Sequence, residues 1–150
     1  MKATEVVERR RALLADFMRE VWSNGDVMRC GAYIAPSYTI HHDPGDAWEK
    51  QTLDLPGFMD RVRLSRAPFP DQQFDIREMF AGEDSLAMTW LWHGTHSGDL
   101  PGFPATGQRL TMSGATIYYF DRANRITGHW QVTDRLGIYQ QLQRAKPHPA

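Results

Sequence analysis

Four segments with strand character follow one another in the second half of the chain, and this order constrains the fold most. The runs cover residues 74–80, 86–94, 110–120 and 126–133, and all are rich in β-forming or alternating apolar residues. The connections at residues 81–84 and 121–124 are turn-like, so neighbouring strands are expected to pair antiparallel. A meander of this kind argues against a doubly wound parallel sheet, in which helices would separate the strands.

The first half of the chain is expected to supply helices that cover this sheet. Apolar residues recur at helical spacing over residues 3–23, and shorter helices are predicted over 26–31 and 55–64. A short strand is predicted over 38–42. A length of 150 residues fits one α+β domain, with an ordered core over about residues 3–142 and a frayed tail over 143–150.

One face of the predicted sheet carries unusually bulky side chains. Because strand residues alternate between faces, Met88, Trp90 and Trp92 share one side, and Met112 and Tyr118 share the matching side of the next strand. Ordinary core packing explains some of them. The chain contains five tryptophans in 150 residues, which also suits an aromatic cavity for a small apolar molecule. The candidate ligand contacts are Met88, Trp90, Trp92, Met112 and Tyr118.

Composition excludes several classes of partner. The net charge of −1 gives no electrostatic basis for binding nucleic acid. No segment approaches the length of an apolar membrane span, and the first residues lack the apolar core of a signal peptide. A single cysteine, Cys30, excludes an internal disulfide, which fits the cytoplasm.

The stretch from His129 to Gly137 ends a strand in a carboxylate, and a helix follows at once. On a regular strand Trp130 and Asp134 share a face, so Asp134 is a candidate acid/base group in the cavity and Trp130 a further ligand contact. His129 would then point to the opposite face, as a structural or exposed residue. The simpler interpretation of Asp134 is a helix N-cap.

The histidines do not predict a metal site. His93 and His96 fall on opposite faces of a regular strand, as do His41 and His42, so no local pair of ligands forms. His96 and His42 can instead line the cavity or anchor a loop by a hydrogen bond. The Gly- and Pro-rich segment at residues 98–107 contains Leu100 and Phe103 and is expected to fold over the cavity mouth.

Three motifs together resemble the SnoaL-like polyketide cyclase family. They are His42-Asp43-Pro44, the loop Gly94-Thr95-His96-Ser97-Gly98 with its later Gly102, Pro104, Thr106 and Gly107, and the ending His129-Trp130 with Asp134-Arg135-Leu136-Gly137. The resemblance runs from about residue 6 to residue 142. It implies a nuclear transport factor 2-like fold, in which a curved sheet and helices form a cone around an internal cavity.

The resemblance also implies a chemistry. In the family the aspartate at the Asp134 position is the acid/base residue of an intramolecular aldol ring closure, without a cofactor. His96 or His42 would hydrogen-bond the developing enolate oxygen. The first hypothesis is therefore a cofactor-independent cyclase or isomerase acting on an apolar carbonyl compound, with Asp134, His96 and His42 as its site. The alternative is a non-catalytic binder of a small hydrophobic molecule.

The outer face of the sheet is expected to form a homodimer. Its members by strand alternation are Thr89, Leu91, His93, Ile117 and Tyr119. Leu91, Ile117 and Tyr119 are apolar enough that a twofold contact between two copies would bury them favourably.

Overall fold

The computed structural model describes residues 2–145, and its elements largely follow the predicted order. The helical segments are α1 (Ala3–Phe17), η1 (Met18–Ser23), η2 (Val27–Ala32), α2 (Leu55–Arg66) and α3 (Arg135–Ala145). The strands are β1 (Ile34–His42), β2 (Thr52–Leu53), β3 (Gln73–Ala81), β4 (Ser85–Thr95), β5 (Arg109–Phe120) and β6 (Ile126–Thr133).

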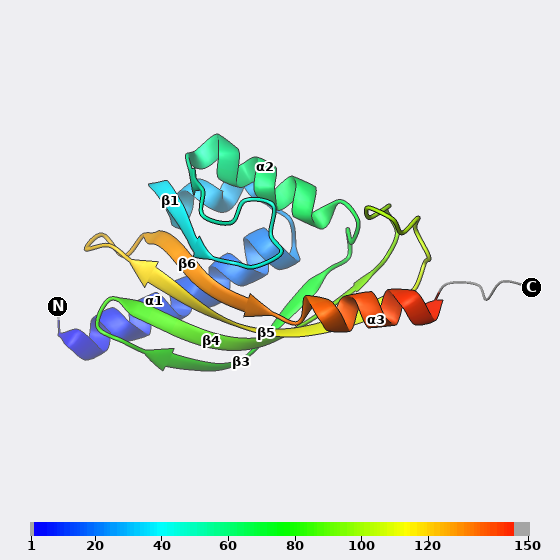
Figure 1. The fold of residues 1–150 in the computed structure, drawn as a ribbon. Coiled ribbons are helices and arrows are strands. Elements are labelled where there is room, and N and C mark those ends of the chain that lie inside the picture. Colours follow the sequence, from blue (N-terminus) through cyan, green and yellow to red (C-terminus); the bar gives the residue numbers. More distant parts are fainter. Residues whose placement is uncertain (1, 146–150) are drawn as a thin grey trace, which may run out of the picture.

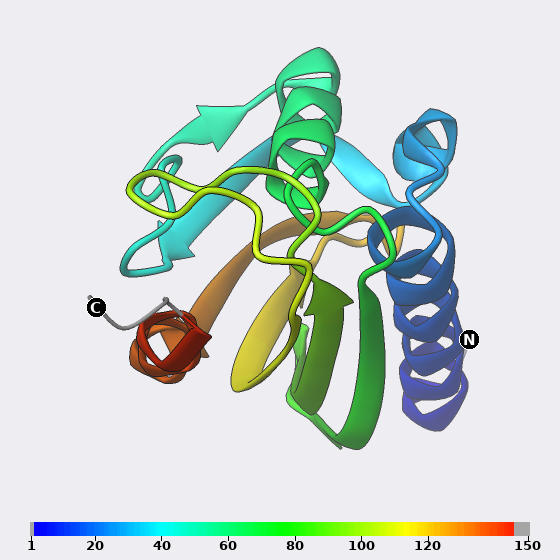
Figure 2. The same ribbon diagram turned by 90° about the vertical axis from the view of Figure 1, so that its right-hand side faces the viewer.

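The strands form one curved sheet, and α1 and α2 cover the same face of it (Figures 1 and 2). The strand order is β2-β1-β6-β5-β4-β3, and every pair is antiparallel except β1 with β6. The predicted α+β architecture, a curved and mostly antiparallel sheet packed with N-terminal helices, is confirmed. Within residues 2–145 no helix is long and apolar enough to cross a membrane.

A bulge in β6 decides which of its side chains face inward. Phe120 of β5 pairs with Ile126, but its neighbour Tyr119 pairs with Gly128, so Thr127 is an extra residue on the β6 side. An extra residue of this kind reverses the alternation beyond it. The residues that follow, His129, Gln131 and Thr133, therefore lie opposite the inner residues Tyr118, Thr116 and Gly114 of β5.

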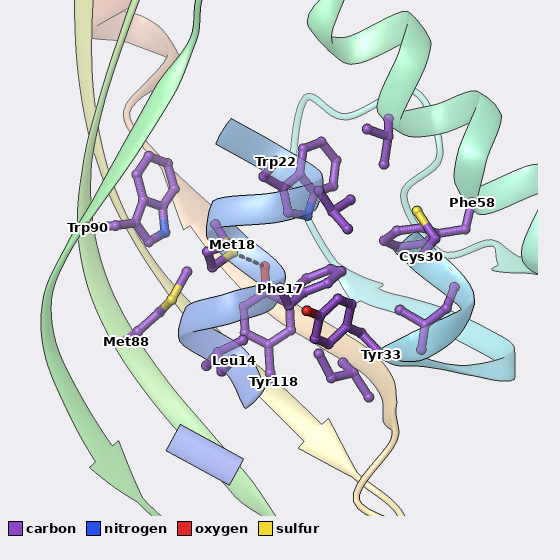
Figure 3. Packing of buried hydrophobic residues seen from close by; sticks show 14 of the residues in the cluster. Leu14, Phe17, Met18, Trp22, Cys30, Tyr33, Phe58, Met88, Trp90 and Tyr118 are labelled. Carbon is purple, nitrogen blue, oxygen red and sulfur yellow. Dashed lines mark hydrogen bonds between the residues drawn. The ribbon is translucent and has the colours of Figure 1, made fainter. Parts of the chain in front are cut away.

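The N-terminal helix changes its winding where it meets the sheet. The predicted helix over residues 3–23 is α-helical only to Phe17 and continues as the π-helical turn η1. Met18, Val21 and Trp22 of this turn are buried. Figure 3 shows Met18 lying towards Met88 and Trp90 of β4, and the Tyr118 hydroxyl donates to the Met18 sulfur at 3.6 Å. Wider turns of this kind recur at functional sites in other proteins.

Several boundaries differ from the prediction. β1 begins at Ile34, four residues before the predicted strand, and the two-residue edge strand β2 was missed. Residues 143–145 continue α3, so the predicted frayed tail does not begin at 143. Residues 146–150 lie outside the described part of the chain.

Candidate functional site

The sheet and its covering helices enclose a cavity of about 280 Å³. On the β3–β5 side its wall is aromatic and thioether in character. Five of the six predicted ligand contacts lie along it: Met88, Trp90, Trp92, Met112 and Tyr118. The volume and the apolar lining suit a small ring compound.

The loop between β4 and β5 and the helix α3 bound the cavity at its mouth, and Figure 2 shows this loop crossing between α2 and α3. Leu100, Pro101 and Phe103 of the loop line the cavity, as the sequence predicted for this segment. The backbones of Leu100 and Phe103 form an isolated β-bridge, and the Phe103 ring lies 5.8 Å from that of Tyr139 on α3. Ordered apolar contacts therefore border the mouth of the cavity.

Asp43 is the centre of a charged cluster on the other side of the cavity. Its side chain is completely buried, and it accepts hydrogen bonds from Arg61 at 3.3 Å, Arg135 at 3.1 Å and His129 Nε2 at 2.9 Å. The Gln131 amide donates to both carboxylate oxygens, at 3.3 and 3.2 Å. With four donor side chains the carboxylate of Asp43 has no room for a further partner.

Local sequence explains how the two arginines reach Asp43. Asp54 begins α2 by accepting from the Gly57 amide at 2.8 Å, and this start sets the helix so that Phe58, Arg61 and Val62 share its buried side. Arg135 opens α3 directly after β6, and its guanidinium also donates to the Pro44 carbonyl. The cluster therefore ties α2, β1, β6 and α3 together.

His129 joins Asp43 to Tyr38. A carboxylate only accepts, so Nε2 of His129 carries the proton, and the Tyr38 hydroxyl donates to Nδ1. Burial lowers the pKa of His129, and the charge of Arg61 lowers it further, against the opposing effect of Asp43. Burial alone would raise the pKa of Asp43, but the hydrogen bond from His129 and the charges of Arg135 and Arg61 bring it below its ordinary value. His129 is thus held neutral beside an ionised Asp43.

Asp46 brings a second carboxylate to this cluster, and it lines the cavity directly. Its Oδ1 accepts from the Trp48 amide at 2.8 Å. Its Oδ2 lies 2.9 Å from Arg61 and 4.0 Å from Arg135. Among the described residues along the cavity, no other side chain is a carboxylate.

Two polar atoms in the cavity wall have no partner within residues 2–145. They are Nε of Arg61 and Oγ1 of Thr133, both buried. Both residues line the cavity. A buried donor without a partner costs free energy, and such an atom gains most from a polar ligand.

The prediction that Asp134 reaches the cavity is wrong. Asp134 is exposed, and its carboxylate accepts from the Gly137 amide at 2.9 Å as the N-cap of α3. Trp130 shares this outer face with a side chain 38% exposed, so it does not line the cavity either. The bulge at Thr127 is the reason, because it moves Trp130 and Asp134 outward and His129 inward. His129 lies on the face opposite Trp130, as expected, but that face is the inner one, so His129 is part of the cavity wall.

The two other predicted catalytic residues also lie away from the cavity lining. His96 is fully buried, and its Nδ1 lies 3.0 Å from the Thr106 hydroxyl, so it anchors the loop between β4 and β5. His42 stacks on Trp130 at a ring distance of 4.3 Å, on the outer side of the sheet. Within residues 2–145 no three His, Cys, Asp or Glu side chains group closely enough to hold a metal ion.

The inner charged residues were not recognised from the sequence, although two signals were present. Asp43 stands in the His42-Asp43-Pro44 motif, and Arg61 stands at helical spacing between apolar neighbours. An arginine on the buried side of a helix needs an anionic partner. Nothing in the local pattern pointed to Asp46, Gln131 or Arg135.

Comparison with known proteins finds one family model and several similar solved structures. The family model for SnoaL-like polyketide cyclase matches residues 12–142. A crystal structure assigned as a polyketide cyclase, from Acidithiobacillus ferrooxidans, is 57% identical with a TM-score of 0.88, over 91% of this chain and 96% of that chain. IdmH from Streptomyces antibioticus, also assigned as a polyketide cyclase, is 27% identical with a TM-score of 0.76, over 89% and 98%.

The same fold carries other assigned activities. AclR from Streptomyces galilaeus, assigned as a hydroxylase, is 20% identical with a TM-score of 0.76, over 95% of this chain and 85% of that chain, and it shares the fold alone. No protein of curated function matches the sequence. The match over residues 12–142 and the identity of 57% establish that the chain belongs to the SnoaL-like polyketide cyclase family.

Proposed function

We propose that the protein is a cofactor-independent enzyme that moves a proton next to the carbonyl group of an apolar cyclic or polyketide-like compound. The observation that carries this proposal is the contrast between the two cavity walls. Aromatic and thioether groups of β4 and β5 face one part of a ligand, while Asp46, Arg61 and Arg135 face the other. An aldol cyclisation or an isomerisation needs both a proton acceptor and a group that stabilises the enolate oxygen.

Charge balance supports a neutral substrate. The two guanidinium groups of Arg61 and Arg135 are matched by the carboxylates of Asp43 and Asp46, and His129 is neutral. The cluster therefore carries no net charge and offers no surplus attraction to an anionic ligand. A ketone gains hydrogen bonds from the cluster without having to shed the hydration of a full charge.

Hydrogen exchange of 2-tetralone in D₂O tests this function. This bicyclic ketone has an acidic methylene group at C1. Proton NMR follows the decay of the C1 signal as deuterium replaces the protons. We expect the protein to accelerate the exchange above the rate in buffer, and calorimetry to detect binding of the ketone. Met112→Trp should weaken both, because Met112 lines the cavity, while Thr111→Trp on the opposite face of β5 should not.

The outcome separates the two classes of function. Binding that Met112→Trp weakens, together with exchange no faster than in buffer, would identify a binding protein and contradict the enzyme. Absence of both binding and exchange would contradict the proposed ligand class as well.

We also propose a homodimer formed through the outer face of the sheet. Leu91 is 40% exposed, Trp130 38% and Val132 44%, and Trp130 pairs across strands with Ile117. These side chains extend the apolar surface predicted from β4 and β5, and a twofold contact would bury it.

Light scattering during gel filtration tests the dimer. At micromolar concentration we expect twice the chain mass of 17.2 kDa. Leu91→Lys combined with Val132→Lys should give the monomer, since it places charges in the contact. A wild-type monomer at that concentration would contradict the proposal.

A further inference from the structure

We infer that Asp46 is the proton acceptor of the cavity. This inference rests on the proposed function and names the residue that would perform it. Two other carboxylates near the site do not fit the role, since Asp134 is exposed on the outer face and Asp43 is fully enclosed by four donor side chains. Asp46 is the carboxylate that lines the cavity within residues 2–145.

The hydrogen bonds of Asp46 leave it able to accept a proton. A carboxylate has about four lone-pair sites. The Trp48 amide occupies a site on Oδ1 and the Arg61 guanidinium occupies one on Oδ2, which fixes the orientation of the group without filling it. Its side chain is only 9% exposed, so a ligand in the cavity would approach it with little competing water.

The guanidinium groups of Arg61 and Arg135 lie close enough to Asp46 to donate hydrogen bonds to an enolate oxygen. Arg61 and Arg135 lie 2.9 and 4.0 Å from Asp46 Oδ2, so a carbonyl oxygen bound to either guanidinium brings its adjacent carbon close to the carboxylate. Thr133 in the same wall carries a buried hydroxyl that has no partner within residues 2–145. Fixed donors at the developing negative charge lower the barrier for enolate formation.

Asp46 can exchange a proton with a ketone through an enolate. Asp46 takes a proton from the carbon next to the carbonyl, and the C–H electron pair forms the carbon–carbon double bond of the enolate. The negative charge moves to the oxygen beside Arg61 or Arg135. In D₂O the protonated Asp46 exchanges with solvent and returns a deuteron to carbon, which regenerates the carboxylate. In a cyclisation the enolate carbon would instead attack a second carbonyl of the same molecule, and the alkoxide oxygen formed there would take the proton from Asp46, which regenerates the carboxylate.

Asp46→Asn is the decisive variant, and Asp134→Asn is its matched control. Asparagine keeps an oxygen that can accept from the Trp48 amide or from Arg61, but it does not accept a proton. We expect Asp46→Asn to bind 2-tetralone with unchanged affinity and to lose about a hundredfold to ten-thousandfold in exchange rate. Asp134→Asn should exchange like the wild type, since asparagine is nearly as good an N-cap.

The possible results separate this inference from the proposed function. Wild-type exchange with an equally active Asp46→Asn variant would overturn the role of Asp46 and leave the function standing. A wild type that binds the ketone but does not accelerate exchange would overturn both. A lower exchange rate in Asp134→Asn but not in Asp46→Asn would assign the role of proton acceptor to Asp134.

A pH–rate profile covers the case in which Asp46→Asn does not fold. The wild-type rate should fall on acidification as one carboxylate is protonated. Asp46→Glu keeps a carboxylate in a changed position relative to Arg61 and Arg135, so the midpoint of its profile should shift, while that of Asp134→Asn stays. A midpoint that does not move in Asp46→Glu would contradict the inference.

Discussion

Asp43→Ala is expected to lower the free energy of unfolding by about 3–5 kcal/mol, the usual cost of removing one partner from a buried ion pair. The Asp43 side chain is fully buried, and Arg61 beside it is also buried. Without the Asp43 carboxylate, Arg61 keeps one carboxylate partner, Asp46, and the donors of His129 and Gln131 lose this acceptor. Urea unfolding monitored by circular dichroism measures the change.

Asp60→Ala is the matched control for Asp43→Ala. Asp60 pairs with Arg63 at 3.0 Å on the exposed side of α2, with side chains 66% and 52% exposed. Exposed pairs of this kind contribute about 0–1 kcal/mol. If the two variants lost the same small amount of stability, Asp43 could not be the centre of a buried cluster.

The stability of the protein is expected to fall as the pH drops below about 6.5, the ordinary pKa of histidine. The pKa of His129 is lower in the folded state, so near and below 6.5 the unfolded chain binds a proton that the folded chain does not. His129 therefore contributes stability above pH 6.5 that is lost as the pH falls towards its folded pKa, at up to about 1.4 kcal/mol per pH unit. Asp43 acts in the same direction below its ordinary pKa of 3.8.

His129→Gln tests the histidine contribution. Glutamine can still donate to Asp43 and accept from Tyr38, but it does not titrate. We expect urea unfolding between pH 7 and pH 5 to show a smaller loss of stability with acidification in His129→Gln than in the wild type, because the unfolded-state proton uptake at residue 129 is gone. Equal slopes in the two proteins would show that His129 is not held neutral by its surroundings.

The sequence predicted the fold well where one regular pattern governs a whole element. β4 and β5 alternate without interruption from Leu86 to Trp92 and from Leu110 to Phe120, and their inner faces are as expected. The elements that differ are those where a local irregularity intervenes. The π-turn at Met18 depends on how the helix packs on the sheet, and the pairing of β2 with β1 depends on a contact outside the local pattern.

The candidate site was predicted less well, and one residue explains much of this. Alternation correctly placed Trp130 and Asp134 on one face of β6 and His129 on the other, but the face with Trp130 was taken as the inner one, and the bulge at Thr127 turns it outward. A single extra residue reverses every side chain beyond it, and Gly128, directly after Thr127, was the one sequence signal of a bulge that the prediction did not use. Asp46 and Arg135 come together only through the fold, since they stand 89 positions apart in the sequence.

A crystal structure of the wild-type protein with 2-tetralone bound tests the central claim most directly. We expect the bicyclic ring to lie against Trp90 and Met112, with its ketone oxygen at a hydrogen-bond distance of about 2.7–3.2 Å from Arg61, Arg135 or Thr133. The C1 carbon should then adjoin the Asp46 carboxylate. A ketone oxygen directed towards Trp92, or ligand bound only on the outer face beside Asp134, would contradict the proposed site.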